Sequence, residues 1–206
     1  MLKLYDYPAS GNCYKIRLLL AQLGQPYRRV PVELLAPGPR PAELLRDNPH
    51  GRVPLVEMED GRRLAESNAI LWYLARGTRF VPEDAWSQAQ TLRWMFFEQN
   101  SIEPNLAVVR FLVALLGQAE RHTAEIEGRR RRGYQALDAM ERQLGASEFF
   151  GAAGYDVADI ALFAYTHVAG EGGFDLLRYP AVRGWLARVQ RQPGHVPIAA
   201  DSRGLL

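Results

Sequence analysis

The stretch that decides the fold is NPHGRVPLV at residues 48–56, and the apolar run at residues 55–58 is typical of a strand. Proline cannot donate a hydrogen bond to a strand ladder, so Pro54 marks the start or the edge of this strand. A cis bond between Val53 and Pro54 would turn the Val53 backbone outward and leave its N–H and C=O available to a ligand. From these residues alone, an ordinary turn that leads into a strand is equally compatible.

Strand and helix patterns alternate over the first 80 residues. Asp60-Gly61 favours a hairpin between the last two strands, and a right-handed crossover makes the first two parallel. The order βαβ-α-ββα predicts a thioredoxin-like domain over residues 1–79. Strands are expected at residues 2–5, 27–32, 55–58 and 62–65, and helices at residues 12–23, 39–46 and 67–75.

The pattern changes after a linker at residues 78–84. From Ala85 onward no stretch has a convincing strand pattern, and apolar residues recur at helical spacing, which predicts core-facing helix sides. The sequence therefore predicts an α/β domain followed by an all-α bundle domain over residues 85–206. The first of these apolar stripes comprises Leu92, Met95, Phe96, Val108, Phe111, Leu112 and Leu115.

Asp156 precedes one of the expected helices and is a good N-cap residue. Asp159 follows three positions later and can reach back to the N–H of Asp156, which predicts a capping box with acidic residues in both positions. We interpret this pair as structural and not catalytic.

Composition limits the classes of function. The chain has 206 residues, of which 48% are hydrophobic, enough for a packed core, and a formal net charge of +2. Such a charge gives no general attraction to nucleic acid or to a membrane. Cys13 is the single cysteine, so no internal disulfide is possible, and no apolar run is long enough to span a bilayer. We expect a cytoplasmic protein.

Four motifs together resemble the glutathione S-transferase family in their order and spacing. They are Ser-Gly-Asn-Cys at residues 10–13, Val-Pro-Leu at 53–55, Glu-Ser at 66–67 and Asp-Val-Ala-Asp-Ile at 156–160. The resemblance spans about residues 1–195 and is strongest to bacterial, cytosolic members with a serine-type active loop. Asp156 departs from the Ser or Thr that the family usually has at that cap.

The resemblance implies a site for glutathione, a tripeptide with two carboxylates, one ammonium and a thiol. In the family, the residues that match Glu66 and Ser67 bind the γ-glutamyl group. This agrees with their position at the start of a helix, where N–H groups and the helix dipole favour a carboxylate. Simple N-capping is the alternative for Ser67.

The middle and the far end of glutathione are assigned to the proline motif. The backbone of Val53, held by Pro54, is expected to pair with the cysteinyl group as a strand partner would. Arg52 is expected to reach the glycine carboxylate. His50 is a second candidate for that carboxylate, although a lone histidine in a turn is more often simply exposed.

Ser10 is expected to activate the thiol. In serine-type members the matching hydroxyl donates to the sulfur beside a helix N-terminus and so stabilises the thiolate. Asn12 can donate a second hydrogen bond, but both residues are also good helix caps. Tyr5 and Tyr7 are rival donors, and Cys13 is interpreted as a buried helix residue.

The resemblance further implies that the second domain forms an acceptor pocket over Ser10, lined by Tyr7, Asn100 and Arg110. The expected function is conjugation of glutathione to small hydrophobic electrophiles. A glutathione-dependent peroxidase or disulfide reductase and a non-catalytic binding module remain alternatives. The family also implies a homodimer that binds glutathione and small electrophiles or peroxides, with no metal, nucleic acid or membrane partner.

Overall fold

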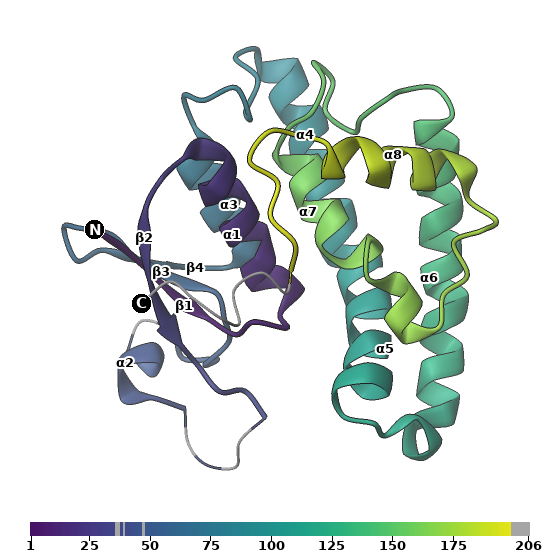
Figure 1. The fold of residues 1–206 in the computed structure, drawn as a ribbon, viewed down its shortest axis with the longest axis horizontal. Helices are drawn as coiled ribbons and strands as arrows, with labels where there is room; N and C mark the ends of the chain where they lie inside the picture. The colour runs from purple at the N-terminus through teal and green to yellow at the C-terminus, as the bar shows by residue number, and fades with distance from the viewer. Residues whose placement is uncertain (36–37, 39, 47, 199–206) are drawn as a thin grey trace. The chain divides into compact units, whose positions relative to one another are not determined.

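The computed structural model describes residues 1–35, 38, 40–46 and 48–198, and the chain divides into two compact units (Figure 1). One unit combines residues Met1–Arg76 with the segment that begins at Pro193. The other is Gly77–Gln192. The first unit is therefore built from both ends of the chain.

The first unit contains a mixed four-stranded sheet in the order β2-β1-β3-β4. β1 pairs in parallel with β2, and β3 pairs antiparallel with both β1 and β4. This arrangement confirms the predicted thioredoxin-like layout. The elements are β1 (Leu2–Asp6), α1 (Gly11–Leu23), β2 (Tyr27–Pro31), α2 (Ala42–Leu45), β3 (Leu55–Glu57), β4 (Arg63–Ala65) and α3 (Ser67–Ala75).

Glycines end two of these elements where the chain must reverse. Gly24 caps α1 with φ of 63°, and its N–H donates to the carbonyls of Leu20 and Ala21. Gly61 has φ of 83° in the turn between β3 and β4, as the Asp-Gly pattern predicts. In both places a glycine avoids the steric cost that a side chain would have at positive φ.

The segment at residues 193–198 packs on α1. The Tyr14 hydroxyl donates to the Val196 carbonyl at 2.7 Å, and Arg17 Nη2 donates to the Ile198 carbonyl at 3.1 Å. A Cβ on Gly194 would come within 2.9 Å of Gln22 Cα, so this contact requires glycine. This segment therefore groups with the first unit. The predicted domain bounds of 1–79 and 85–206 stay a prediction, and the last of these limits lies outside the described residues.

The second unit contains helices and no strand over its described residues, and α8 runs across the other helices (Figure 1). This confirms the predicted all-α part. The α-helices are α4 (Ala85–Phe97), α5 (Val108–Arg110), α6 (Thr123–Leu144), α7 (Val157–Thr166) and α8 (Pro180–Gln190). Two π-helices, η1 (Glu98–Ala107) and η2 (Phe111–Leu115), and two 3-10 helices, η3 (Ala119–His122) and η4 (Ala169–Gly172), complete the unit.

The π-helical stretch changes which residues face the core. Pro104 lies inside η1 and has no N–H for a helical hydrogen bond. A π-helix has more residues per turn than an α-helix, so a stripe drawn at α-helical spacing drifts across it. The prediction that Phe96 and Phe111 face the core is wrong, because their exposed fractions are 63% and 37%. Phe111 follows η1 and is affected by this drift, whereas Phe96 lies before η1 on the exposed side of α4.

The predicted capping box at the start of α7 is confirmed. Asp156 Oδ1 accepts from the Ala158 N–H at 2.7 Å, and Asp159 Oδ2 accepts from the Asp156 N–H at 3.1 Å. Asp159 is fully buried, and its Oδ1 also accepts from Trp185 Nε1 at 2.7 Å. Burial, followed by the neighbouring Asp156 carboxylate, raises the pKa of Asp159 to about 7. The pair is structural, as expected.

Candidate active site

Ser10 is the N-cap of α1. Its Oγ accepts from the Cys13 N–H at 3.2 Å, and its backbone lies in the extended region with φ of −72° and ψ of 120°. The cap uses a lone pair of Oγ and not the hydroxyl proton. Capping and donation to a thiolate are therefore compatible roles of one side chain, and not the alternatives that the sequence suggested.

Asn12 and Ser67 lie together, although one is on α1 and the other on α3. The Ser67 hydroxyl donates to Asn12 Oδ1 at 3.1 Å. The amide nitrogen of Asn12 is a donor, whereas its Oδ1 is an acceptor. That nitrogen is the donor which a thiolate would need.

Ser67 is not the cap of α3. The cap is Glu66, and Ser67 is the first residue of the helix with an exposed fraction of 5%. Glu66 has φ of 69° and ψ of 111°, and it is the one non-glycine residue with positive φ among the described residues. Such backbone strain costs of order 1–3 kcal/mol and is concentrated at functional sites.

Lys15 is a residue that the sequence analysis missed. It is fully buried on α1, and its Nζ donates to Ser67 Oγ and to Asn68 Oδ1, each at 3.2 Å. The signal in the sequence was its position three residues after Asn12, one helical turn along α1.

The Val53–Pro54 peptide bond is cis, as predicted. The pairing of β3 begins at Leu55, so the Val53 backbone lies outside the described strand ladder. Arg52 is exposed, and its carbonyl accepts from Asn48 Nδ2 at 2.6 Å. Asn48 is buried, was not singled out from the sequence, and holds the start of this motif.

Cys13 is a structural residue, as expected. The side chain is fully buried, and burial raises the pKa of its thiol to about 12, with the Asp6 carboxylate acting in the same direction. Because the thiolate is the reactive form, Cys13 is inert at neutral pH.

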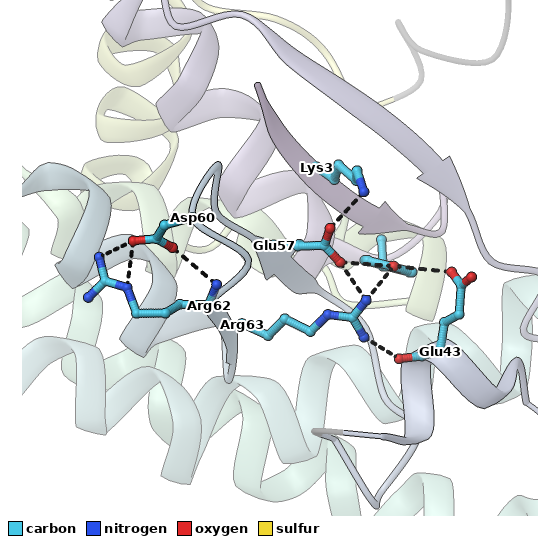
Figure 2. Close-up of polar contacts among 7 residues, drawn as sticks. Lys3, Glu43, Glu57, Asp60, Arg62 and Arg63 are labelled. Atoms are coloured by element: carbon cyan, nitrogen blue, oxygen red, sulfur yellow. Dashed lines mark hydrogen bonds and ion pairs between the residues drawn. The ribbon is translucent and has the colours of Figure 1, made fainter.

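Tyr5 is a poor candidate for the thiolate donor. Its side chain is buried, and its hydroxyl contacts Glu43 Oε2 at 3.4 Å, Glu57 Oε2 at 3.5 Å and Arg63 Nη2 at 3.3 Å. Figure 2 shows Glu43, Glu57, Arg63 and Lys3 converging from α2, β3, β4 and β1. Burial raises the pKa of the Tyr5 hydroxyl, and the contacts with these charged side chains already occupy it.

The expected acceptor-pocket residues are divided between the units. Tyr7 is half-buried in the first unit and packs against the apolar cluster that contains Val53. Asn100 is exposed on η1 in the second unit, where buried Arg110 donates from Nε to Glu171 Oε2 at 2.7 Å. The meeting of these three residues in one pocket stays a prediction.

Over the described residues, no group of three or more His, Cys, Asp or Glu side chains is placed to hold a metal ion. None of the helices described is long and apolar enough to cross a membrane.

Family models match both units. The glutathione S-transferase N-terminal domain matches residues 1–76, and the C-terminal domain of the same family matches residues 123–188. The chain belongs to the glutathione S-transferase family. The matching N-terminal domain contains Ser10, Asn12, Lys15, Val53 and Ser67, so the contacts described above belong to that family domain.

Known members agree with this assignment. A glutathione S-transferase structure from Pseudomonas fluorescens [Pf-5] is 48% identical, with a TM-score of 0.93 over 96% of this chain and 98% of that one. Disulfide-bond oxidoreductase YfcG of Escherichia coli (strain K12) is 31% identical over 94% of this chain and 92% of its own. Maleylacetoacetate isomerase of Rhizobium meliloti (strain 1021) is 37% identical over 68% of this chain and 67% of its own.

Proposed function

We propose that this protein is a glutathione transferase that activates the thiol of glutathione for conjugation to small hydrophobic electrophiles. The observation that carries the proposal is the hydrogen bond from Ser67 to Asn12. It joins the helix start suited to a γ-glutamyl carboxylate with the loop suited to a thiolate. A single tripeptide with a carboxylate at one end and a thiol in the middle fits that pairing.

The first unit supplies the contacts for the tripeptide. Ser67 and the N-terminal N–H groups of α3 receive the γ-glutamyl carboxylate, and the exposed Glu66 receives its ammonium. The Val53 backbone, next to cis Pro54, pairs with the cysteinyl group. Exposed Arg52 pairs with the glycine carboxylate.

Ser10 acts on the thiol. A free thiol with a pKa near ~8.5 is largely protonated at neutral pH. Donation from the Ser10 hydroxyl at the N-terminus of α1, helped by the amide of Asn12, stabilises the thiolate. The thiolate then forms a carbon–sulfur bond with the electrophile, and the proton passes to solvent or to the leaving group. Tyr7, Asn100 and Arg110 form the acceptor pocket in this proposal.

A second candidate is glutathione-dependent reduction of a disulfide or a peroxide on the same site. Asn12 in the active loop favours it, and one relative is named as a disulfide-bond oxidoreductase. In this chemistry two glutathione molecules supply two electrons and leave as glutathione disulfide, while the substrate is reduced and takes up two protons. It needs no cysteine in the protein, which suits the buried Cys13.

One assay panel separates these functions. The protein is tested for retention on immobilised glutathione, and then for turnover of a chloronitrobenzene, a hydroperoxide and a small disulfide. Conjugation of the chloronitrobenzene supports the transferase, and turnover of the other two alone supports the second candidate. Retention without turnover points to a non-catalytic binding module, and no retention contradicts glutathione binding.

We also propose that the protein is a cytoplasmic homodimer. α4 exposes two large apolar side chains, Trp86 at 73% and Phe96 at 63%, which a monomer has little reason to keep. Family members pair through an isologous contact, in which each subunit presents the same surface. Sedimentation should give twice the chain mass of 23.2 kDa, and a species of the single chain mass at micromolar concentration would contradict the dimer.

A further inference from the structure

The buried ammonium of Lys15 is the feature that the proposed chemistry has not used. Lys15 lies on α1 with no exposed surface, and its Nζ is 3.2 Å from both Ser67 Oγ and Asn68 Oδ1 on α3. Lys3 and Lys15 are the only two lysines among 25 lysine and arginine residues in the sequence. Lysine thus stands at this buried position in a chain whose cationic residues are otherwise nearly all arginine.

The hydroxyl of Ser67 is held from two sides. It accepts from Lys15 and donates to Asn12 Oδ1. A carboxylate at the start of α3 would therefore turn the Ser67 proton away from Asn12, while the ammonium still fixes the position of Oγ. A carboxylate oxygen at ~2.7 Å from Oγ would lie within about 6 Å of Nζ, a range in which opposite charges attract appreciably.

We propose that Lys15 is a positioning residue for the γ-glutamyl carboxylate of glutathione. Its ammonium orients the Ser67 hydroxyl and supplies a buried positive charge behind the helix start. The inference rests on the glutathione site proposed above. It assigns the recognition of one particular carboxylate to a residue that never touches it.

Lysine suits this role better than arginine. An ammonium is a compact charge with three donors on a flexible stem, so it can serve Ser67 and Asn68 in a closed space. A guanidinium is a wider planar fork that suits bidentate partners, whereas Lys15 donates to two separate acceptors on neighbouring residues. Burial also keeps water from screening the charge, so its effect on the carboxylate is stronger than that of a surface cation.

The wild-type protein allows a direct test, because its lysine side chains give only two signals. The protein is labelled with ¹⁵N and ¹³C in lysine alone, and the Nζ and Cε resonances are followed by NMR during titration. The two probes are glutathione and 4-aminobutyryl-cysteinyl-glycine, which lacks only the γ-glutamyl α-carboxylate. The Lys15 resonances should move with glutathione and stay nearly fixed with the decarboxylated peptide.

Lys3 is an internal control in the same spectra. Its Nζ is paired with Glu57 Oε1 at 2.6 Å in the cluster of Figure 2. Its resonances should not follow either peptide. If saturation with glutathione leaves the Lys15 resonances unmoved, the proposal is wrong.

Substitution gives the energetic test. Lys15→Met keeps the length of the side chain and removes the charge, and Lys3→Met is the matched control. Lys15→Met should raise the dissociation constant of glutathione about 10- to 100-fold, the loss expected when the Ser67 hydroxyl is no longer positioned to donate to the charged carboxylate. Lys15→Met should change the dissociation constant of the decarboxylated peptide by less than about threefold, because this peptide has no carboxylate for Ser67 and Lys15 to recognise.

The outcomes separate this inference from the proposed function. If the wild type binds neither peptide, the glutathione site itself is absent. If the wild type binds glutathione but Lys15→Met weakens both peptides equally, Lys15 only supports the fold and the positioning role is rejected. Thermal unfolding of each variant identifies a folding failure, in which case the titration of the wild type decides.

Discussion

Ser67 donates its hydroxyl proton to Asn12 Oδ1 at 3.1 Å, and the two residues are 55 positions apart in the sequence. One belongs to the first turn of α3 and the other to the first turn of α1. Two helix N-termini thereby lie side by side and direct positive dipole ends to one region. A ligand that carries one carboxylate and a second group that becomes negatively charged, such as a thiol, suits this region.

Removal of the Ser67 hydroxyl should weaken glutathione binding. A hydrogen bond to a charged group is worth roughly 1.5–3 kcal/mol, so Ser67→Ala should raise the dissociation constant about 10- to 100-fold. Isothermal titration measures it. Ser147→Ala, which loses a hydroxyl bonded to the Gln143 carbonyl, should bind as the wild type does. An unchanged affinity in folded Ser67→Ala would exclude the proposed contact.

Ser10→Ala should raise the pKa of bound glutathione by roughly one to two units, because one charge-assisted hydrogen bond to the thiolate is lost. Turnover should fall at neutral pH and partly recover at high pH. The ultraviolet absorbance of the thiolate, followed across pH, gives the titration.

Ser10→Asp separates the two roles of this residue. Aspartate accepts from the Cys13 N–H as serine does, so the cap and the melting temperature should be kept. A carboxylate cannot donate to the sulfur, so the thiolate should be lost. An unshifted titration in Ser10→Ala with a large shift in Asn12→Ala would transfer the role to Asn12.

Tyr5→Phe should leave the thiolate intact and cost stability. The hydroxyl contacts Arg63, Glu43 and Glu57, and its loss should lower the free energy of unfolding by about 1 kcal/mol. Urea denaturation measures this, and the thiolate absorbance should match that of the wild type. Loss of the thiolate in this variant would restore Tyr5 as a donor.

Glu66→Gly should stabilise the fold and weaken binding. Glycine adopts φ of 69° without steric cost, which relieves of order 1 kcal/mol of strain after its own entropy is counted. The carboxylate for the ligand ammonium is lost at the same time. Glu66→Ala is the control, since it loses the carboxylate and keeps the strain. Equal melting temperatures of the two variants would show that the backbone is unstrained.

The stability of the second unit should fall as pH rises from about 5 to 7. Burial raises the pKa of Asp156 to about 6 and that of Asp159 to about 7, from a usual value of 3.8. In this window the folded protein holds protons that the unfolded chain has released, so the free energy of unfolding decreases with pH. The free energy of unfolding should change by several kcal/mol, because a shift of one pKa unit corresponds to about 1.36 kcal/mol.

Asp156→Asn tests this assignment. Asparagine keeps the N-cap and removes both one titration and the charge beside Asp159, so the pH dependence should become shallower. His195 has a pKa lowered by burial and acts in the opposite direction, but equally in both proteins. The midpoints of urea denaturation, measured between about pH 5 and 7, compare the wild type with Asp156→Asn. Parallel curves would mean that this pair does not titrate there.

Local chemistry made several features of both units predictable. The cis bond before Pro54, the turn at Gly61 and the capping box of Asp156 each depend on residues within a few positions of one another. The sheet order followed from the alternation of strand and helix patterns. The family motifs then placed Ser10 and Ser67 in one predicted site.

Contacts between distant segments were not predictable in the same way. The burial of Lys15 against Ser67 depends on how closely α1 and α3 approach each other, and the spacing of apolar residues in the sequence does not give that distance. The cluster around the Tyr5 hydroxyl combines residues of four elements. The π-helical stretch around Pro104 shifted Phe111 away from the core because the stripe was drawn across it at α-helical spacing, whereas Phe96 lies before that stretch, on the exposed side of α4.

The return of residues 193–198 to α1 has a consequence for synthesis on the ribosome. The Tyr14 hydroxyl and Arg17 meet the carbonyls of Val196 and Ile198 only after the whole of Gly77–Gln192 has been made. At about 5–20 residues per second, this takes roughly 6 to 23 seconds. The nascent thioredoxin-like sheet therefore emerges from the tunnel long before its last segment, and a chaperone that shields α1 in this interval would meet a partly uncovered helix.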